Sequence, residues 1–248
     1  MRSALDEILR HPAVWCMGQL PPPGRPGIPT GCDALDRELP ERGWPVGALT
    51  ELLVSHRGVG ELSLLMPALR RLSEEGKTIA LLAPPLAPHA CAWGACGVRL
   101  DNLIVIEAGD ADLLWAAEQA LRSGACAMAI VWSQRDERVF DYRALRRLQL
   151  AADRGGAACL LYRPPHAAAS ASPAPLRLAL AAGEGELAVN IFKRRGAALV
   201  VPVRISPFPA HWRKRYGTQA ALCAGQAEGA GKPARRNFPG NTVPSARS

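Results

Sequence analysis

The sequence predicts an α/β protein in which helices flank a mostly parallel sheet, followed by a C-terminal β-hairpin and a basic, disordered tail. Between residues 48 and 163, short apolar segments alternate with stretches whose apolar residues recur at helical spacing. Two further apolar segments flank Gly183-Glu184-Gly185, a pattern typical of a hairpin. Beyond Pro207 the chain is rich in Ala, Gly, Pro, Arg and Ser, which leaves too little apolar surface to fold by itself.

The apolar segments predict parallel strands, because strands covered by helices on both faces are apolar throughout. They are residues 48–54, 78–83, 103–107, 125–132 and 157–162. Helices are expected at 61–75, with a kink at Pro67, at 110–122 and at 141–154. The hairpin strands are expected at 176–182 and 186–193, and residues 199–205 are expected to add one strand.

This pattern divides the chain into three regions. Residues 1–27 combine a short helix, introduced by Ser3 and Asp6, with a linker rich in Pro and Gly. Residues 28–205 are expected to form the core with its hairpin, and residues 206–248 the tail.

The chain of 248 residues has a formal charge of +8 that is distributed very unevenly. Residues 186–248 hold eleven Lys and Arg against two acidic residues, so this stretch carries +9 and the preceding 185 residues carry −1. No run of about 18 apolar residues predicts a membrane span, and the acidic residues near the N-terminus argue against a signal peptide. The seven cysteines form no CxxC pair, which favours reduced, buried thiols in a cytoplasmic protein over a zinc site.

Residues 49–66 have the order expected of a phosphate-binding loop: an apolar strand, a turn with Gly58 and Gly60, and a helical stretch. Alignment on Gly60 puts Ser55 at the first glycine position, Glu61 at the lysine position and Leu62 at the position of the Mg²⁺-binding hydroxyl. A glutamate repels a triphosphate and a leucine cannot bind a metal. The segment is therefore either a degenerate nucleotide site or a turn that never bound phosphate.

A second position agrees with the loss of a nucleotide site. In ATPases of this kind an apolar strand ends in an aspartate that supports Mg²⁺. Here the run of residues 127–132 ends in Trp132, whose indole offers no carboxylate. We therefore expect no ATPase activity, no bound cofactor and no metal.

The residues that precede the loop resemble the start of a RecA-type core. The matching residues are Thr30-Gly31, Leu35-Asp36, Gly43, Pro45, Gly47 and Glu51. More narrowly, the chain resembles the ImuA family through IPTGCDALDREL, GWPVGALTELL, GVGELSLLMPALRRLS, LLWAAEQALRSGAC and ALRRLQLAADRGGAACLLYRP. That family also has Gly-Glu where RecA has Gly-Lys, so Glu61 fits the resemblance.

The resemblance implies a RecA-like core and a non-catalytic adaptor role in SOS-induced, error-prone translesion DNA synthesis. The implied partners are an ImuB-type relative of Y-family polymerases, an error-prone polymerase and RecA, in the cytoplasm and at the nucleoid when engaged. A SulA-like inhibitor of cell division and an active RecA-type ATPase with an unusual loop remain as alternatives.

Two basic segments near the C-terminal end are candidate contacts to DNA or to a partner protein. Lys193, Arg194 and Arg195 follow the second hairpin strand, where they are either phosphate contacts or a solvated strand end. Trp212, Arg213, Lys214, Arg215 and Tyr216 combine cations with aromatic rings. That combination suits stacking on single-stranded DNA, a short partner-binding segment anchored by its tryptophan, or a solubilising tail.

Overall fold

The computed structural model describes residues 25–56, 58–133, 137–183, 186–196, 199 and 201–206. The predicted N-terminal helix and all of the tail beyond Ser206, with Trp212, Arg213, Lys214, Arg215 and Tyr216, lie outside the described residues. Their roles therefore stay predictions. Within the described part of the chain, no helix is long and apolar enough to cross a bilayer.

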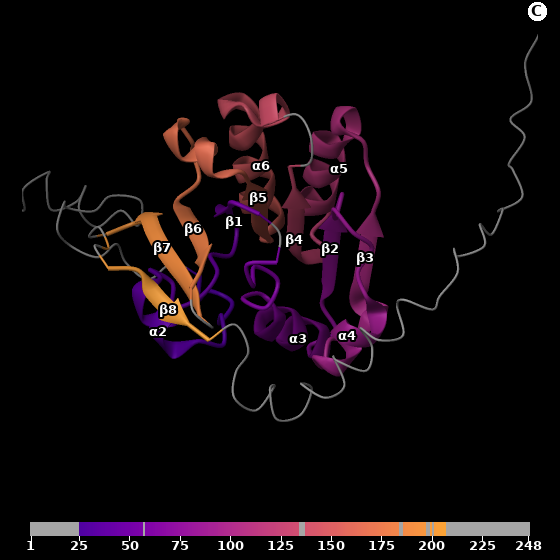
Figure 1. Ribbon diagram of the computed structural model, residues 1–248. Coiled ribbons are helices and arrows are strands. Elements are labelled where there is room, and N and C mark those ends of the chain that lie inside the picture. Colours follow the sequence, from indigo (N-terminus) through magenta and orange to yellow (C-terminus); the bar gives the residue numbers. More distant parts are fainter. Residues whose placement is uncertain are drawn as a thin grey trace, which may run out of the picture.

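The centre of the protein is one mostly parallel sheet of eight strands (Figure 1). The strands are β1 (Ala48–Val54), β2 (Thr78–Leu82), β3 (Leu103–Ile106), β4 (Cys126–Trp132), β5 (Ala158–Arg163), β6 (Leu176–Ala182), β7 (Leu187–Lys193) and β8 (Val203–Ile205). Their order is β3-β2-β4-β5-β1-β6-β7-β8, so β3 and β8 form the two edges. Strands β1 to β6 pair in parallel, whereas β7 is antiparallel to both β6 and β8. This confirms the predicted α/β class, and β6 and β7 pair in antiparallel register at the residues where a hairpin was expected.

Helices cover both faces of the sheet, and each face has its own apolar layer. The helices are α2 (Asp33–Glu38), α3 (Met66–Glu74), α4 (Ala90–Ala95), α5 (Asp110–Arg122) and α6 (Tyr142–Gly155). Buried side chains of α2, α3 and α4 pack on one face, and those of α5 and α6 pack on the other. Three 3-10 turns complete the fold at Leu100–Asn102, Glu137–Phe140 and Pro165–Ala169. Because strand side chains alternate between faces, neighbouring residues of β2 contribute to opposite layers.

The helix that follows the candidate phosphate loop differs from the prediction. Residues 61–65 form turns, and α3 begins only at Met66, with Pro67 in its first turn. Proline lacks an N–H group and is accommodated where no intrahelical hydrogen bond is needed. The predicted kink at Pro67 is therefore wrong, because this residue starts the helix and does not interrupt it.

Other differences lie at the edges of the sheet and in one loop. Strand β3 was expected to be covered on both faces, yet Ile104 is 50% and Val105 45% exposed. The strand expected at 199–205 is shorter, and only Val203–Ile205 pairs with β7. Helix α4 was not predicted by the apolar spacing. Its N-terminus is capped by His89, whose Nδ1 accepts the N–H of Ala92 at 3.2 Å.

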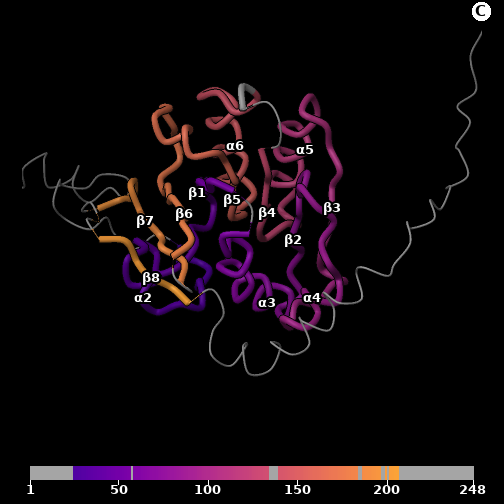
Figure 2. The backbone as a smooth tube through the Cα atoms, in the orientation of Figure 1, coloured from indigo at the N-terminus to yellow at the C-terminus, as the bar shows by residue number. Residues whose placement is uncertain are grey.

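The segment that precedes β1 is fixed by close backbone contacts. Ile28 and Trp44 form an antiparallel bridge with N···O distances of 2.9 and 2.7 Å. A Cβ atom on Gly43 would lie 2.4 Å from the Ile28 carbonyl oxygen, so only glycine fits there. Helix α2, which lies between Ile28 and Trp44 in this segment, lies beside β8 from the other end of the described chain (Figure 2). The residues before the loop that resemble the start of a RecA-type core are called the lead-in from here on. They thus belong to the core of the fold.

Candidate functional site

The candidate site lies where the carboxyl ends of parallel strands meet, which is where open α/β sheets bind ligands. The loop of residues 55–60 follows β1 directly. Trp132 ends β4, and its register partner Tyr162 lies near the end of the neighbouring strand β5. Tyr162 is in turn the register partner of Leu52 on β1. The sheet therefore brings the loop and both rings together at the carboxyl ends of its parallel strands, although they are far apart in the sequence.

The loop uses one of its own side chains as an anion. The N–H of Gly58 faces both carboxylate oxygens of Glu61, at 3.2 Å from Oε1 and 3.1 Å from Oε2. Gly58 has a φ of +85° and Gly60 a φ of +98°, a left-handed conformation that glycine adopts without strain. In a phosphate-binding loop, backbone N–H groups of this kind face phosphate oxygens. Here the Glu61 carboxylate accepts the Gly58 N–H in place of a phosphate oxygen.

A turn separates helix α3 from the loop. Leu64 donates its N–H to the Gly60 carbonyl at 3.1 Å, and Met66 donates to the Leu62 carbonyl at 3.1 Å. Helix α3 therefore begins only at Met66, after this turn, whereas a phosphate-binding helix begins directly at its loop. The side chain of Leu62 packs against the core, so this position presents a hydrocarbon surface where a metal-binding hydroxyl would be needed.

An aromatic pair fills the space beneath the loop. The rings of Trp132 and Tyr162 stack with centroids 5.4 Å apart and an interplanar angle of 19°. The Tyr162 hydroxyl donates to the Glu61 carbonyl oxygen at 2.8 Å. Burial, together with the charge of Glu61, raises the pKa of Tyr162 well above its ordinary value of 10. The hydroxyl therefore stays protonated and holds the turn at Glu61.

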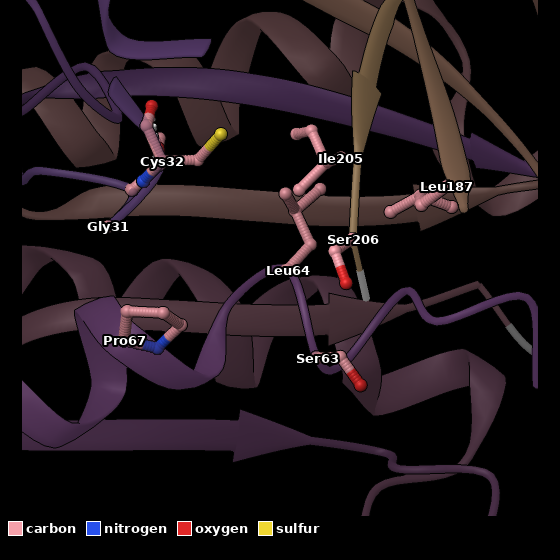
Figure 3. A pocket seen from close by; sticks show the side chains of 9 residues that line it. Gly31, Cys32, Ser63, Leu64, Pro67, Leu187, Ile205 and Ser206 are labelled. Carbon is pink, nitrogen blue, oxygen red and sulfur yellow. Dashed lines mark hydrogen bonds between the residues drawn. The ribbon is translucent and has the colours of Figure 1, made fainter. Parts of the chain in front are cut away.

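A recess beside this turn joins it to the lead-in segment and the hairpin (Figure 3). Gly31 and Cys32 lie on one side, Leu187 and Ile205 on the other, with Leu64 between them. The backbone N–H of Thr30 is already bonded to Asp36 Oδ1 at 2.9 Å, and its hydroxyl contacts the backbone of Cys32. Because Thr30 is paired within the chain and much of the remaining lining is apolar, we interpret the recess as a packing seam between the lead-in and the turn.

A buried cluster of charges supports β1 on the opposite face of the sheet, the one covered by α5 and α6. Glu51 is fully buried, and its Oε2 accepts from Arg163 Nη1 at 3.1 Å and from Arg177 Nη2 at 3.2 Å. Ser172 donates its hydroxyl to the other oxygen, Oε1. Arg177 also donates to the carbonyl oxygens of Ala167, Ala168 and Ser170. The cluster ties β1 to β5, to β6 and to the 3-10 turn between them.

This cluster is the main feature that local sequence patterns missed. Glu51 was noted only as part of the lead-in, whereas its partners lie 112 and 126 residues further along the chain. A charged residue that interrupts an otherwise apolar strand was the available signal, and Glu51, Arg163 and Arg177 all lie on strands.

The basic residues at the end of β7 have partners within the fold. Lys193 Nζ donates to the Ser172 carbonyl at 2.7 Å, and burial, with the neighbouring charge of Arg177, lowers the pKa of Lys193. Arg194 Nη1 pairs with Glu38 Oε2 at 2.9 Å and joins β7 to α2. Arg195 is more exposed and lies 3.9 Å from Glu41. Arg195 is therefore more accessible than Arg194 for the predicted contact to DNA or to a partner.

No metal centre is formed by the described residues, among which no three His, Cys, Asp or Glu side chains come together. Of their cysteines, Cys126 and Cys159 are buried as expected, whereas Cys91 is exposed. No family model matches the sequence, and no curated protein matches it. The resemblance to RecA and to the ImuA family therefore stays an expectation that depends on the sequence motifs, whose residues lie before β1, on β1 and its loop, and on α3, α5, α6 and β5.

Proposed function

We propose that this protein is a non-catalytic, RecA-like adaptor in SOS-induced, error-prone translesion DNA synthesis, which links an ImuB-type protein, an error-prone polymerase and RecA. The observation that carries the proposal is the contact of the Glu61 carboxylate with the Gly58 N–H, in a loop at the carboxyl end of β1. The loop lies at the carboxyl end of a strand in a mostly parallel sheet, where such folds bind nucleotides, and its Gly58 N–H is occupied by the Glu61 carboxylate.

The other groups around the loop support the absence of nucleotide chemistry. Trp132 stacks on Tyr162 where a carboxylate would support Mg²⁺, and α3 begins only at Met66. Phosphoryl transfer depends on positioned positive charge and on a held metal ion. Position 61 carries a negative charge instead, which favours an interaction role over an ATPase.

Calorimetric titration with Mg·ATP tests the loop. The full chain is expected to bind no nucleotide at micromolar concentration. The double variant Glu61→Lys, Leu62→Thr is a matched test. It introduces the lysine and the hydroxyl of a phosphate-binding loop but keeps the late start of α3 and the aromatic pair. It is also expected to remain without binding. Micromolar binding by the unaltered chain that is lost in Gly60→Asp would establish an ATPase-type site instead.

Pull-down experiments with the purified ImuB-type protein and RecA from the same genome test the adaptor role. The full chain is expected to retain both, with and without Mg·ATP. Retention of neither would refute the role. Cell filamentation on overexpression, together with binding to the division GTPase, would favour the SulA-like alternative.

A further inference from the structure

Helix α6 presents a row of arginines to solvent. Its buried side chains are all apolar: Ala144, Leu145, Leu148, Ala151 and Ala152. The outward side carries Arg143, Arg146, Arg147 and Arg154, and Arg122 joins them from the end of α5. These five arginines are called the α6 basic face from here on.

Little negative charge compensates the α6 basic face. Arg147 pairs with Glu118, at 2.6 Å between Nε and Oε1. Arg122, Arg143, Arg146 and Arg154 form no ion pair with another described residue. Asp153 is the acidic residue exposed on α6 itself. Asp141, which is exposed at the N-cap of α6, accepts the N–H of Ala144 at 2.7 Å. Five arginines thus face three carboxylates, those of Glu118, Asp153 and Asp141.

The ends of α5 and α6 gather the cations around a hollow. A Cβ atom on Gly155 would lie 1.8 Å from the Leu121 carbonyl oxygen, so only glycine allows the two helices to approach so closely. Arg122, Arg147 and Arg154 line one solvent-open hollow of about 250 Å³, together with Glu118 and Leu150.

Helix stability does not account for all of these arginines. Cations in a last turn, such as Arg154, are favoured by the negative end of the helix dipole. Arg143 lies in the first turn of α6, where the dipole disfavours a positive charge, and the carboxylate of Asp141 at the N-cap is already bonded to the Ala144 N–H. A binding role explains a cation in that place.

We infer that the α6 basic face binds the phosphodiester backbone of nucleic acid. From Arg143 to Arg154 the helix rises about 16 Å, a length that spans about five phosphates of one strand when measured along the axis of a duplex. The planar guanidinium group donates two parallel hydrogen bonds to phosphate oxygens. An extended polyanion matches a row of this length. The inference depends neither on the adaptor role nor on the basic tail.

The test measures binding of the full chain to a fluorescently labelled duplex by anisotropy, at salt concentrations from about 50 to 200 mM. The variant Arg143→Gln, Arg146→Gln, Arg154→Gln removes three charges from the α6 basic face. The matched control Arg37→Gln, Arg71→Gln, Arg99→Gln removes three exposed charges on α2, on α3 and before β3. Equal thermal midpoints show that both variants remain folded.

Each phosphate contact adds about 0.9 to the slope of log K against log salt. The face variant is therefore expected to lower the magnitude of that slope by about 2.7, with affinity reduced at least tenfold at low salt, while the control stays close to the unaltered chain. Equal losses in both variants would show a general charge effect and overturn the inference. Unchanged DNA binding by the face variant would also overturn the inference. This includes the outcome in which that variant binds DNA as before but no longer binds an acidic polypeptide such as polyglutamate.

Discussion

Replacement of Glu51 by Gln tests how the buried charge cluster stabilises the core. Glu51 is fully buried, and Arg163 and Arg177 are only 4% and 5% exposed. The glutamine has nearly the same volume, so packing is preserved while the negative charge is removed. Both guanidinium groups then stay buried without a counter-charge, and one carboxylate acceptor becomes an N–H donor that faces them.

The expected cost follows from the loss of one partner of a buried ion pair. Such a loss destabilises proteins by about 3–5 kcal/mol, because the remaining charge is left uncompensated away from water. This is a large part of the total of about 5–15 kcal/mol that holds a domain folded. We therefore expect Glu51→Gln to lower the free energy of unfolding by about 3–5 kcal/mol.

Urea denaturation followed by circular dichroism measures this change. The control is Glu74→Gln, which breaks an exposed pair with Arg70 on α3 and should cost less than about 1 kcal/mol. The double variant Glu51→Gln, Arg163→Met should be more stable than the sum of its single changes implies, because it removes one of the stranded charges. A cost below about 1 kcal/mol for Glu51→Gln, or strict additivity in the double variant, would refute the reasoning.

Three further predictions concern packing, an inter-element contact and pH. Gly31→Ala should destabilise the protein by about 1–3 kcal/mol in thermal denaturation, because its φ is +80° and the new Cβ would lie 2.4 Å from Pro67 Cβ. Gly76→Ala, with a φ of +71° and open space around it, measures the backbone strain alone, and an equal cost at both sites would disprove the packing argument. Arg194→Ala should speed amide hydrogen exchange in α2 through loss of its salt bridge to that helix, and unchanged exchange would contradict this. Burial, followed by the effect of a neighbouring thiol, raises the pKa of Cys159 from its ordinary value of 9.0, so above that pH only the unfolded chain releases this proton. Stability should then fall as pH rises, and Cys159→Ala should make the decline shallower by up to about 1.4 kcal/mol per pH unit in urea titrations.

The strands were predictable because burial on both faces leaves a continuous apolar signature in the sequence. The prediction for 48–54 matches β1, and 110–122 matches α5. The prediction of a helix at 61–75 was wrong at its start, because the leucines of 61–65 are spaced as in a helix but pack from turns. Apolar spacing reports which side chains are buried and does not distinguish the first turn of a helix from the loop before it.

The candidate site was predictable where it depends on neighbours in sequence. Glu61, Leu62 and Trp132 could be identified because each occupies a fixed offset from a strand or a glycine. The hydrogen bond between Tyr162 and Glu61 joins residues 101 positions apart. Such contacts depend on which strands become neighbours in the sheet, and local periodicity carries no information about strand order.

Under the proposed role, the internal carboxylate of the loop determines how the protein responds to nucleotides. Proteins that switch with a nucleotide change shape when the γ-phosphate leaves, because the loops that contacted it lose their partner. In this protein the anion at the Gly58 N–H belongs to Glu61, which is covalently attached, and the Tyr162 hydroxyl fixes the same residue from below. The loop thus keeps its partner in every nucleotide state. Under the proposed role, partner binding responds to protein concentration and salt and is indifferent to Mg·ATP, whereas a nucleotide-dependent change in affinity would show that the Glu61 contact opens.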